Sequence, residues 1–189
     1  QKKEEKTKVD LAMEMIREDR KNGILPQWYG GDALYGRAWK MTTFIEEECR
    51  ACFVMDTTKD QLIYLNDPSD KRRKPVTIEH YYKQIALTKQ KIVRYQSNKK
   101  AYAHIVPVYT KDTKQDKQPR ARLLIISKGL SKGSKVKFSL SNFTLKEKTA
   151  GQLVYMQRAR FNVEQYFREA NQTAGMGDYQ VRGYQAWHH

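Results

Sequence analysis

Two carboxylates far apart in the sequence, Asp32 and Glu164, are the residues best suited to metal-dependent chemistry. Asp32 follows Gly30-Gly31 at the end of a short apolar run, and Glu164 lies within a long amphipathic segment. Two Mg²⁺ or Mn²⁺ ions held by carboxylates activate water and stabilise the leaving alkoxide during phosphodiester cleavage. A strand-end aspartate and a distant helical glutamate suit that task, because α/β sheets bind ligands at the carboxyl ends of their strands.

Each carboxylate also has an ordinary structural interpretation. Asp32 is of a type that closes turns or caps helices. Glu164 and Arg160, one helical turn apart, form a common pair on a solvated helix face. Gln157, Arg160, Glu164 and Asn171 follow one another at spacings of 3, 4 and 7, so a helix would carry all four on one face.

Alternating helix and strand signals surround Asp32. Val9–Arg20 has apolar residues at helical spacing, and Asn22-Gly23 predicts the end of that helix. Ile24–Gly31 predicts a strand that ends at Asp32. Gly36–Ala51 indicates a second helix, and Cys52–Leu65 indicates extended structure broken by a polar turn. This order predicts an α/β fold.

The positive charge is concentrated in one internal segment. The 189 residues contain 36 Lys and Arg and 21 Asp and Glu, a net charge of +15. Between Pro68 and Ala150 there are 21 Lys and Arg but only 5 Asp and Glu, so this segment carries +16 and the remainder -1. Such a field attracts polyanions, of which nucleic acid is the commonest.

The basic segment is also rich in β-strand signals. Strands are predicted at Lys91–Tyr95, Tyr102–Tyr109, Arg122–Ser127 and Lys135–Leu140, and a short helix at Ile78–Ala86. Lys148–Asn171 then predicts a long helix. The chain therefore divides into an α/β part at 1–65, a basic β-rich insertion at 66–147, and a helix with its tail at 148–189.

Tyrosines and cations alternate within the insertion, at Tyr81, Tyr82, Arg94, Tyr95, Tyr102 and Tyr109. A nucleic-acid-binding surface has this pattern, because its lysines neutralise phosphates and its tyrosines stack on the nucleic acid. The same pattern is found in a sheet with cross-strand tyrosine pairs, where lysines protect the edges of the sheet. We expect both to apply.

Two cysteines, Cys49 and Cys52, have CxxC spacing. A zinc site needs a second pair or suitably spaced histidines, which the sequence lacks. The cysteines are therefore interpreted as reduced thiols near a helix end.

Several stretches together resemble a known family. They are Gln157–Asn171, Gly175–His189, Gly31–Gly36 and Lys137–Asn142. They are similar to the catalytic region of bacterial insertion-sequence DDE transposases. The resemblance implies an RNase H-like mixed sheet with flanking helices, interrupted by a basic β-rich insertion. It also implies cleavage and strand transfer at transposon ends with two Mg²⁺ or Mn²⁺ ions.

The resemblance assigns roles to individual residues. Asp32 matches the second catalytic aspartate and Glu164 the glutamate, so both are metal ligands and catalytic residues. Arg160 matches the arginine of the family pattern Tyr-x2-Arg-x3-Glu-x6-Lys, which contacts DNA, whereas Gln157 and Asn171 replace its tyrosine and lysine. The residues expected to contact DNA are Arg160, Arg158, Gln157, Asn171, Tyr35 and Arg182.

The first catalytic aspartate of the family has no counterpart here. Asp10 and Asp19 lie within the first predicted helix and are poor substitutes. We therefore expect a fragment that is inactive alone, from a bacterial cytoplasmic protein that binds double-stranded transposon-end and target DNA as a homodimer. The alternatives are a basic nucleic-acid-binding protein without catalysis, and an inactivated transposase that still binds DNA.

Overall fold

The computed structural model describes residues 6–69, 73–85, 89–111 and 118–159. The chain divides into two units, Gln1–Gln157 and Arg158–His189, and almost all described residues belong to the first. Four predicted site residues lie outside the described ranges: Arg160, Glu164, Asn171 and Arg182.

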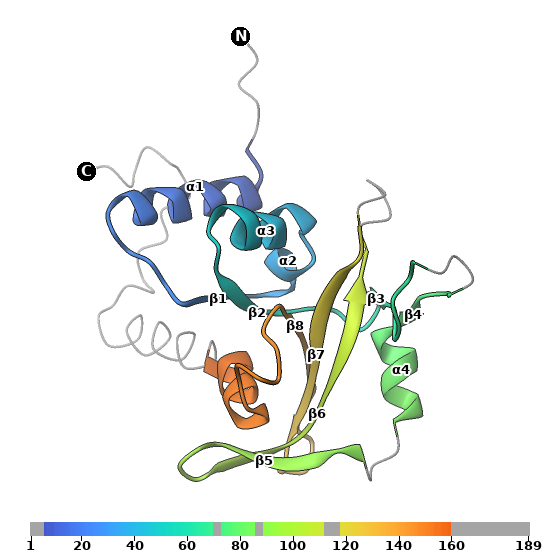
Figure 1. The fold of residues 1–189 in the computed structure, drawn as a ribbon. Coiled ribbons are helices and arrows are strands. Elements are labelled where there is room, and N and C mark those ends of the chain that lie inside the picture. Colours follow the sequence, from blue (N-terminus) through green and yellow to red (C-terminus); the bar gives the residue numbers. More distant parts are fainter. Residues whose placement is uncertain (1–5, 70–72, 86–88, 112–117, 160–189) are drawn as a thin grey trace, which may run out of the picture. The chain divides into compact units, whose positions relative to one another are not determined.

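One mixed sheet of six strands organises the first unit (Figure 1), in the order β1-β2-β8-β7-β6-β5. β1 runs parallel to β2, and every other neighbouring pair is antiparallel. The strands are β1 (Trp28–Gly31), β2 (Cys52–Asp56), β5 (Lys91–Gln96), β6 (Lys99–Thr110), β7 (Arg120–Gly129) and β8 (Val136–Ser141). A separate two-stranded sheet pairs β3 (Leu62–Ile63) with β4 (Val76–Thr77).

Helices flank this sheet, so the expected α/β class is confirmed. They are α1 (Lys8–Lys21), α2 (Ala33–Gly36), α3 (Trp39–Thr43), the π-helical turn η1 (Phe44–Glu48), α4 (Ile78–Gln84) and a helical segment at 150–159. α1 begins at a capping box between Thr7 and Asp10, which satisfies backbone donors of its first turn. It ends at Asn22, where the sequence predicts its end.

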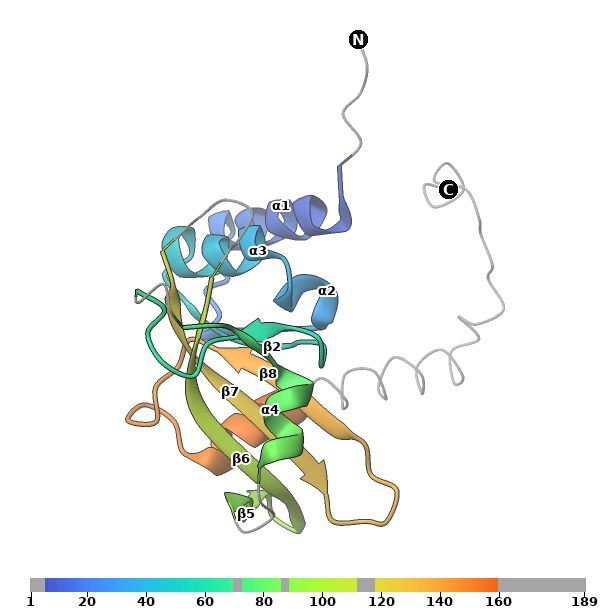
Figure 2. The same ribbon diagram turned by 90° about the vertical axis from the view of Figure 1, so that its right-hand side faces the viewer.

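The two faces of the sheet are covered by different elements. On one face, which we call the α4 face, Val108, Leu124 and Leu140 pack with Ile78 of α4. On the opposite face, Ala103 and Ile125 pack with Leu153 of the 150–159 helix, among other residues. Figure 2 shows α4 in front of β6 and β7, with β5 beyond the end of the helix.

A third cluster covers β1 and β2. Phe53 and Met55 of β2 pack with Val9 of α1 and with Phe44 and Ile45 of η1. These helices lie over the end of the sheet that is farthest from β5 in strand order.

The strands of the basic segment continue the same sheet as β1 and β2. β8 pairs directly with β2, and β7 is buried on both faces from Arg122 to Ser127, as is typical of a central strand. The predicted boundaries at 65/66 and 147/148 therefore fall inside one compact unit. None of the helices in the described ranges is long and apolar enough to cross a membrane.

Two predicted elements differ in extent. The strand predicted at Ile24–Gly31 begins only at Trp28, where its partner β2 begins at Cys52. Pro26, which has no N–H to donate, lies just before it. The predicted helix at Gly36–Ala51 is divided, because α2 ends at Gly36 and α3 begins at Trp39.

Candidate functional site

Asp32 immediately follows β1, at the carboxyl end of a strand that is parallel to its neighbour. Its Oδ1 accepts a hydrogen bond from the N–H of Leu34 at 2.9 Å, and Asp32 is the N-cap of α2. The strand-end position and the helix cap, considered as alternatives from the sequence, are therefore both present. Its side chain is half-buried.

A second carboxylate, Asp56, lies at the same edge of the sheet. The register pairs Gly31 with Met55, so Asp32 and Asp56 are the next residues along the two parallel strands. Asp56 Oδ1 accepts a hydrogen bond from Ser139 Oγ at 2.7 Å. Asp56 was not among the predicted site residues, although its position at the end of an apolar run gives the same signal as that of Asp32.

A buried hydrogen-bond network connects this edge to the 150–159 helix through Gln157. Gln157 Oε1 accepts from Ser127 Oγ at 2.5 Å, and Nε2 donates to Ser139 Oγ at 2.9 Å and to the carbonyl of Ile125 at 3.1 Å. Ser139 donates in turn to Asp56. The network joins four elements. Ser127, Ser139 and Gln157 are almost fully buried, and Asp56 is half-buried.

This burial concerns one of the residues predicted to contact DNA. The side chain of Gln157 is only 3% exposed and both ends of its amide are hydrogen-bonded inside the protein. A side chain in this position anchors the helix to the sheet. Contact of Gln157 with DNA remains a prediction from the sequence.

The other predicted site residues are only partly covered by the structure. Tyr35 lies in α2 and packs half-buried against the cluster that covers β1 and β2. Arg158 is within the described helix and is half-buried. The roles predicted for Arg160, Glu164, Asn171 and Arg182 fall on residues outside the described ranges.

Across the described residues, no group of three or more His, Cys, Asp or Glu side chains is placed to hold a metal ion. Asp32 and Asp56 are carboxylates of the kind that Mg²⁺ and Mn²⁺ prefer. Glu164, the predicted partner of Asp32, lies outside the described ranges.

Two arginines of the basic segment are used inside the protein. Arg122 of β7 donates from Nη1 and Nη2 to the two carboxylate oxygens of Glu46, both at 2.8 Å. Arg120 donates to Glu46 at 2.6 Å and also pairs with Glu47. Burial lowers the pKa of Arg122, although Glu46 opposes this effect. The pairs fasten β7 to η1.

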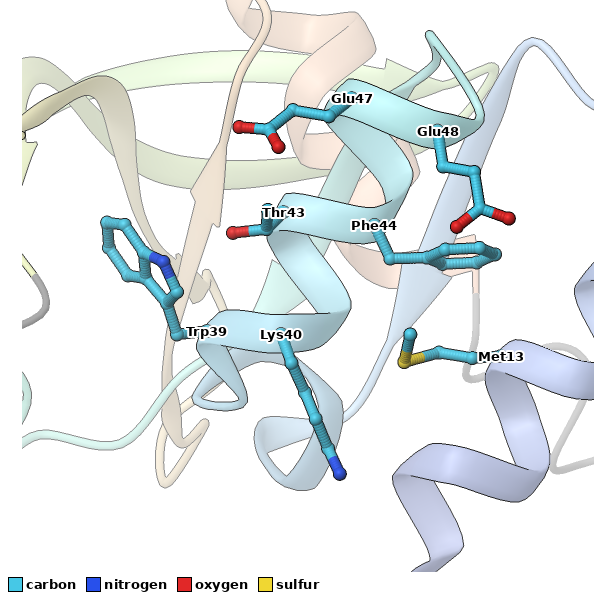
Figure 3. Close-up of a pocket in the computed structure, with 7 residues that line it drawn as sticks. All are labelled: Met13, Trp39, Lys40, Thr43, Phe44, Glu47 and Glu48. Atoms are coloured by element: carbon cyan, nitrogen blue, oxygen red, sulfur yellow. The ribbon is translucent and has the colours of Figure 1, made fainter. Parts of the chain in front are cut away.

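A pocket of about 270 Å³ lies between α1 and the α3–η1 helix (Figure 3). Met13, Trp39 and Phe44 supply its apolar surface, and Lys40, Thr43, Glu47 and Glu48 also line it. Its charged groups already have partners: Lys40 pairs with Asp10, Glu47 with Arg120 and Glu48 with Arg17. None of the predicted site residues lines this pocket.

The cysteines lie where η1 passes into β2. Cys49 caps the end of η1 and is buried, and Cys52 begins β2. Both thiols are free, and burial raises the pKa of each. These positions agree with the interpretation of two thiols near a helix end.

The strands β5, β6, β7 and β8 contain no aspartate or glutamate. Their lysines and arginines therefore face no acidic neighbour within these strands, and the acidic partners of Arg120 and Arg122 come from η1. These strands contain eight of the 21 lysines and arginines between Pro68 and Ala150.

Neither a comparison with protein-family models nor one with curated protein sequences finds a match to this chain.

Proposed function

We propose that the chain is the catalytic region of an insertion-sequence DDE transposase with an RNase H-like core. It cleaves the phosphodiester backbone at transposon ends and joins these ends to target DNA. Its partners are double-stranded DNA and a second copy of the same protein, in the bacterial cytoplasm.

The observation that carries the proposal is the position of Asp32 at the carboxyl end of β1, parallel to β2. In an α/β sheet this edge is where catalytic carboxylates gather. The sequence resemblance supplies Glu164 as the second carboxylate and Mg²⁺ or Mn²⁺ as the bound ions.

Different residues of the chain bind the metal, orient a metal ligand and bind the DNA. Asp32 and Glu164 hold the metal, which when bound lowers the pKa of water and stabilises the departing oxygen. The Leu34 N–H fixes the orientation of the Asp32 carboxylate through its hydrogen bond. Basic side chains of β5 to β8 bind the DNA phosphates.

One observation favours the second candidate, a DNA-binding protein without catalysis. Asp32 caps α2, a role that needs no metal, while the absence of acidic residues from β5 to β8 suits nucleic-acid binding by itself. An inactivated transposase that keeps its DNA contacts belongs to the same class.

The test uses the natural full-length protein and DNA from the ends of its own element, with Mg²⁺. We expect Asp32→Asn and Glu164→Gln each to reduce end cleavage at least about a hundredfold, because the loss of an outer-shell partner alone costs about 10–100-fold in such sites. Mn²⁺ binding, followed by electron paramagnetic resonance, should weaken in both variants.

The matched control is Asp60→Asn, which changes a solvent-exposed aspartate paired with Arg37 at 3.5 Å. It should cleave like the wild type. Undiminished cleavage by Glu164→Gln would exclude the role given to that residue. DNA binding without cleavage by any form of the protein, wild type included, would support the second candidate.

A further inference from the structure

Two large side chains on the α4 face of the sheet are exposed near β5 in the part of the chain that the structure describes. Tyr102 of β6 is paired in register with Ile92 of β5 on one side and with Lys128 of β7 on the other. Residues opposite each other in neighbouring strands point to the same face, so these three side chains form one row across the sheet. Tyr102 is 39% exposed and Ile92 is 56% exposed.

Cations surround this row. Arg94 is opposite Lys100 in the next row toward the β5–β6 turn, and both are exposed. On the other side, the carbonyl of Lys89 lies 3.3 Å from Nδ1 of His104, whose ring contacts Tyr81 of α4. An exposed tyrosine and isoleucine thus lie among three cations, Arg94, Lys100 and Lys128, in strands that contain no carboxylate.

We infer that this surface, formed by Ile92, Arg94, Lys100, Tyr102 and Lys128, binds single-stranded DNA. The inference rests on the proposed function for its DNA partner and adds the strand form and the location. Cations alone would suffice to hold a duplex by its phosphates. An exposed aromatic ring flanked by cations is instead how proteins bind unpaired strands, because bases stack on the ring while the cations track the backbone.

The dimensions agree with a short contact. Three strands spaced about 4.8 Å apart span about 10 Å. At about 3.4 Å per nucleotide, the rise of a stacked duplex strand, this is room for at most roughly three nucleotides.

The opposite face provides matched controls in the same strands. The adjacent row contains Lys91, paired with Ala103, and Lys137, paired with Ser127. Ala103 packs against the 150–159 helix, which places this row on the opposite face. Tyr155 of that helix is 41% exposed, close to the value for Tyr102.

The experiment measures fluorescence anisotropy of a labelled twelve-nucleotide oligo(dT) and of a duplex of equal length, with the 189-residue chain. Tyr102→Ala should weaken single-strand binding about tenfold, and Tyr102→Phe should retain it because the ring remains. Tyr155→Ala should bind like the wild type. Urea unfolding of each variant checks that it is folded.

Charge is tested with two double variants of equal net charge. Lys100→Gln with Lys128→Gln should weaken single-strand binding and reduce the slope of log K against log salt by about 1.4, or about 0.7 per phosphate contact. Lys91→Gln with Lys137→Gln should have less than half of this effect. Equal effects of the two doubles, or wild-type binding by Tyr102→Ala, would overturn the inference.

The duplex arm separates this inference from the proposed function. Retained duplex binding, with no effect of Tyr102→Ala on the single strand, would overturn the inference alone. If the wild-type chain binds neither the single strand nor the duplex, DNA is not its partner and the proposed function fails as well.

Discussion

At the scale of single residues, the protein uses its buried charges to connect distant segments. Glu46 of η1 binds both Arg120 and Arg122, although 76 residues separate Glu46 from Arg122 in the sequence. Arg122 also lies over the ring of Phe53, 5.3 Å from its centroid. A guanidinium that is almost fully buried is tolerated only because a carboxylate accepts from it.

Glu46→Gln should therefore destabilise the fold by about 3 kcal/mol, because it leaves the charge of Arg122 buried without an anion. The free energy of urea unfolding measures this change. Glu47→Gln is the matched control. The Glu47 side chain is 65% exposed, so the free energy of unfolding should fall by less than about 1 kcal/mol. Equal losses in both variants would show that burial of Arg122 is not the cause.

The residue scale also shows what sequence patterns can predict about a site. Asp32 was predicted because a local signal, an apolar run ending at a carboxylate, marks a strand end. The partners of Gln157 were not predictable, since Ser127 and Ser139 reach it only through the register of β7 with β8. The sequence alone therefore did not predict whether a polar residue of this helix, such as Gln157, is exposed or buried.

At the scale of elements, close backbone contacts fix how the short helices are placed. A Cβ on Gly36, at the end of α2, would lie 2.1 Å from the carbonyl oxygen of Asp56. Only glycine permits this approach of α2 to the end of β2. The same contact holds Asp32, at the start of α2, beside the end of β2.

Gly36→Ala should destabilise the protein by at least about 1–3 kcal/mol, because a backbone atom cannot move aside as a side chain can. Thermal or urea unfolding provides the measurement. Gly129→Ala is the control: its Cβ would meet the hydroxyl of Ser134 at 2.7 Å, and that side chain is able to rotate away. The packing described would be contradicted if Gly36→Ala lowered the stability less than Gly129→Ala.

The start of α1 should be sensitive to acid. Hydrogen bonds from Lys40 and Thr7 lower the pKa of Asp10 from 3.8 to about 2. A carboxylate with a lowered pKa stabilises the fold above its ordinary pKa, and this contribution disappears as the pH falls through the folded value. The stability that Asp10 gives to α1 is therefore complete above about pH 4 and lost near pH 2.

Lys40→Met should raise the pKa of Asp10 toward 3.8, as measured by NMR titration of its side chain. The stability difference between wild type and this variant should shrink as the pH is lowered toward 2. Lys8→Met, which changes an exposed lysine in the first turn of α1, serves as the control. A pKa of Asp10 that stays near 2 in Lys40→Met would refute the assigned cause.

Most elements of the first unit were predictable because their signals are local. The 3.6-residue period of α1 and the β-branched and aromatic runs of β5 to β8 require no knowledge of their neighbours. The pairing of β2 with β8 was not predictable, because nothing near Cys52–Asp56 specifies a partner more than 80 residues later. The insertion was therefore expected as a separate unit, whereas its strands extend the sheet.

At the scale of the whole first unit, charge and topology coincide. Acidic residues lie in the helices over β1 and β2, and the strands from β5 to β8 have none. Strands β1 and β2, next to Asp32, contain one charged residue, Asp56, whereas β5 to β8 contain eight lysines and arginines. In the proposed function this asymmetry orients bound DNA along the sheet.

The pairing of β2 with β8 has a further consequence, for the order of folding. Asp56 and Ser139 are 83 residues apart, whereas β5 and β6 are joined by a turn. Contacts between distant segments form slowly, since a long loop must close first. In pulsed hydrogen exchange during refolding, we expect amides of β5 to β7 to become protected before those of β1 and β2. Simultaneous protection would contradict this order, under which the positive half of the protein exists before the edge that carries Asp32.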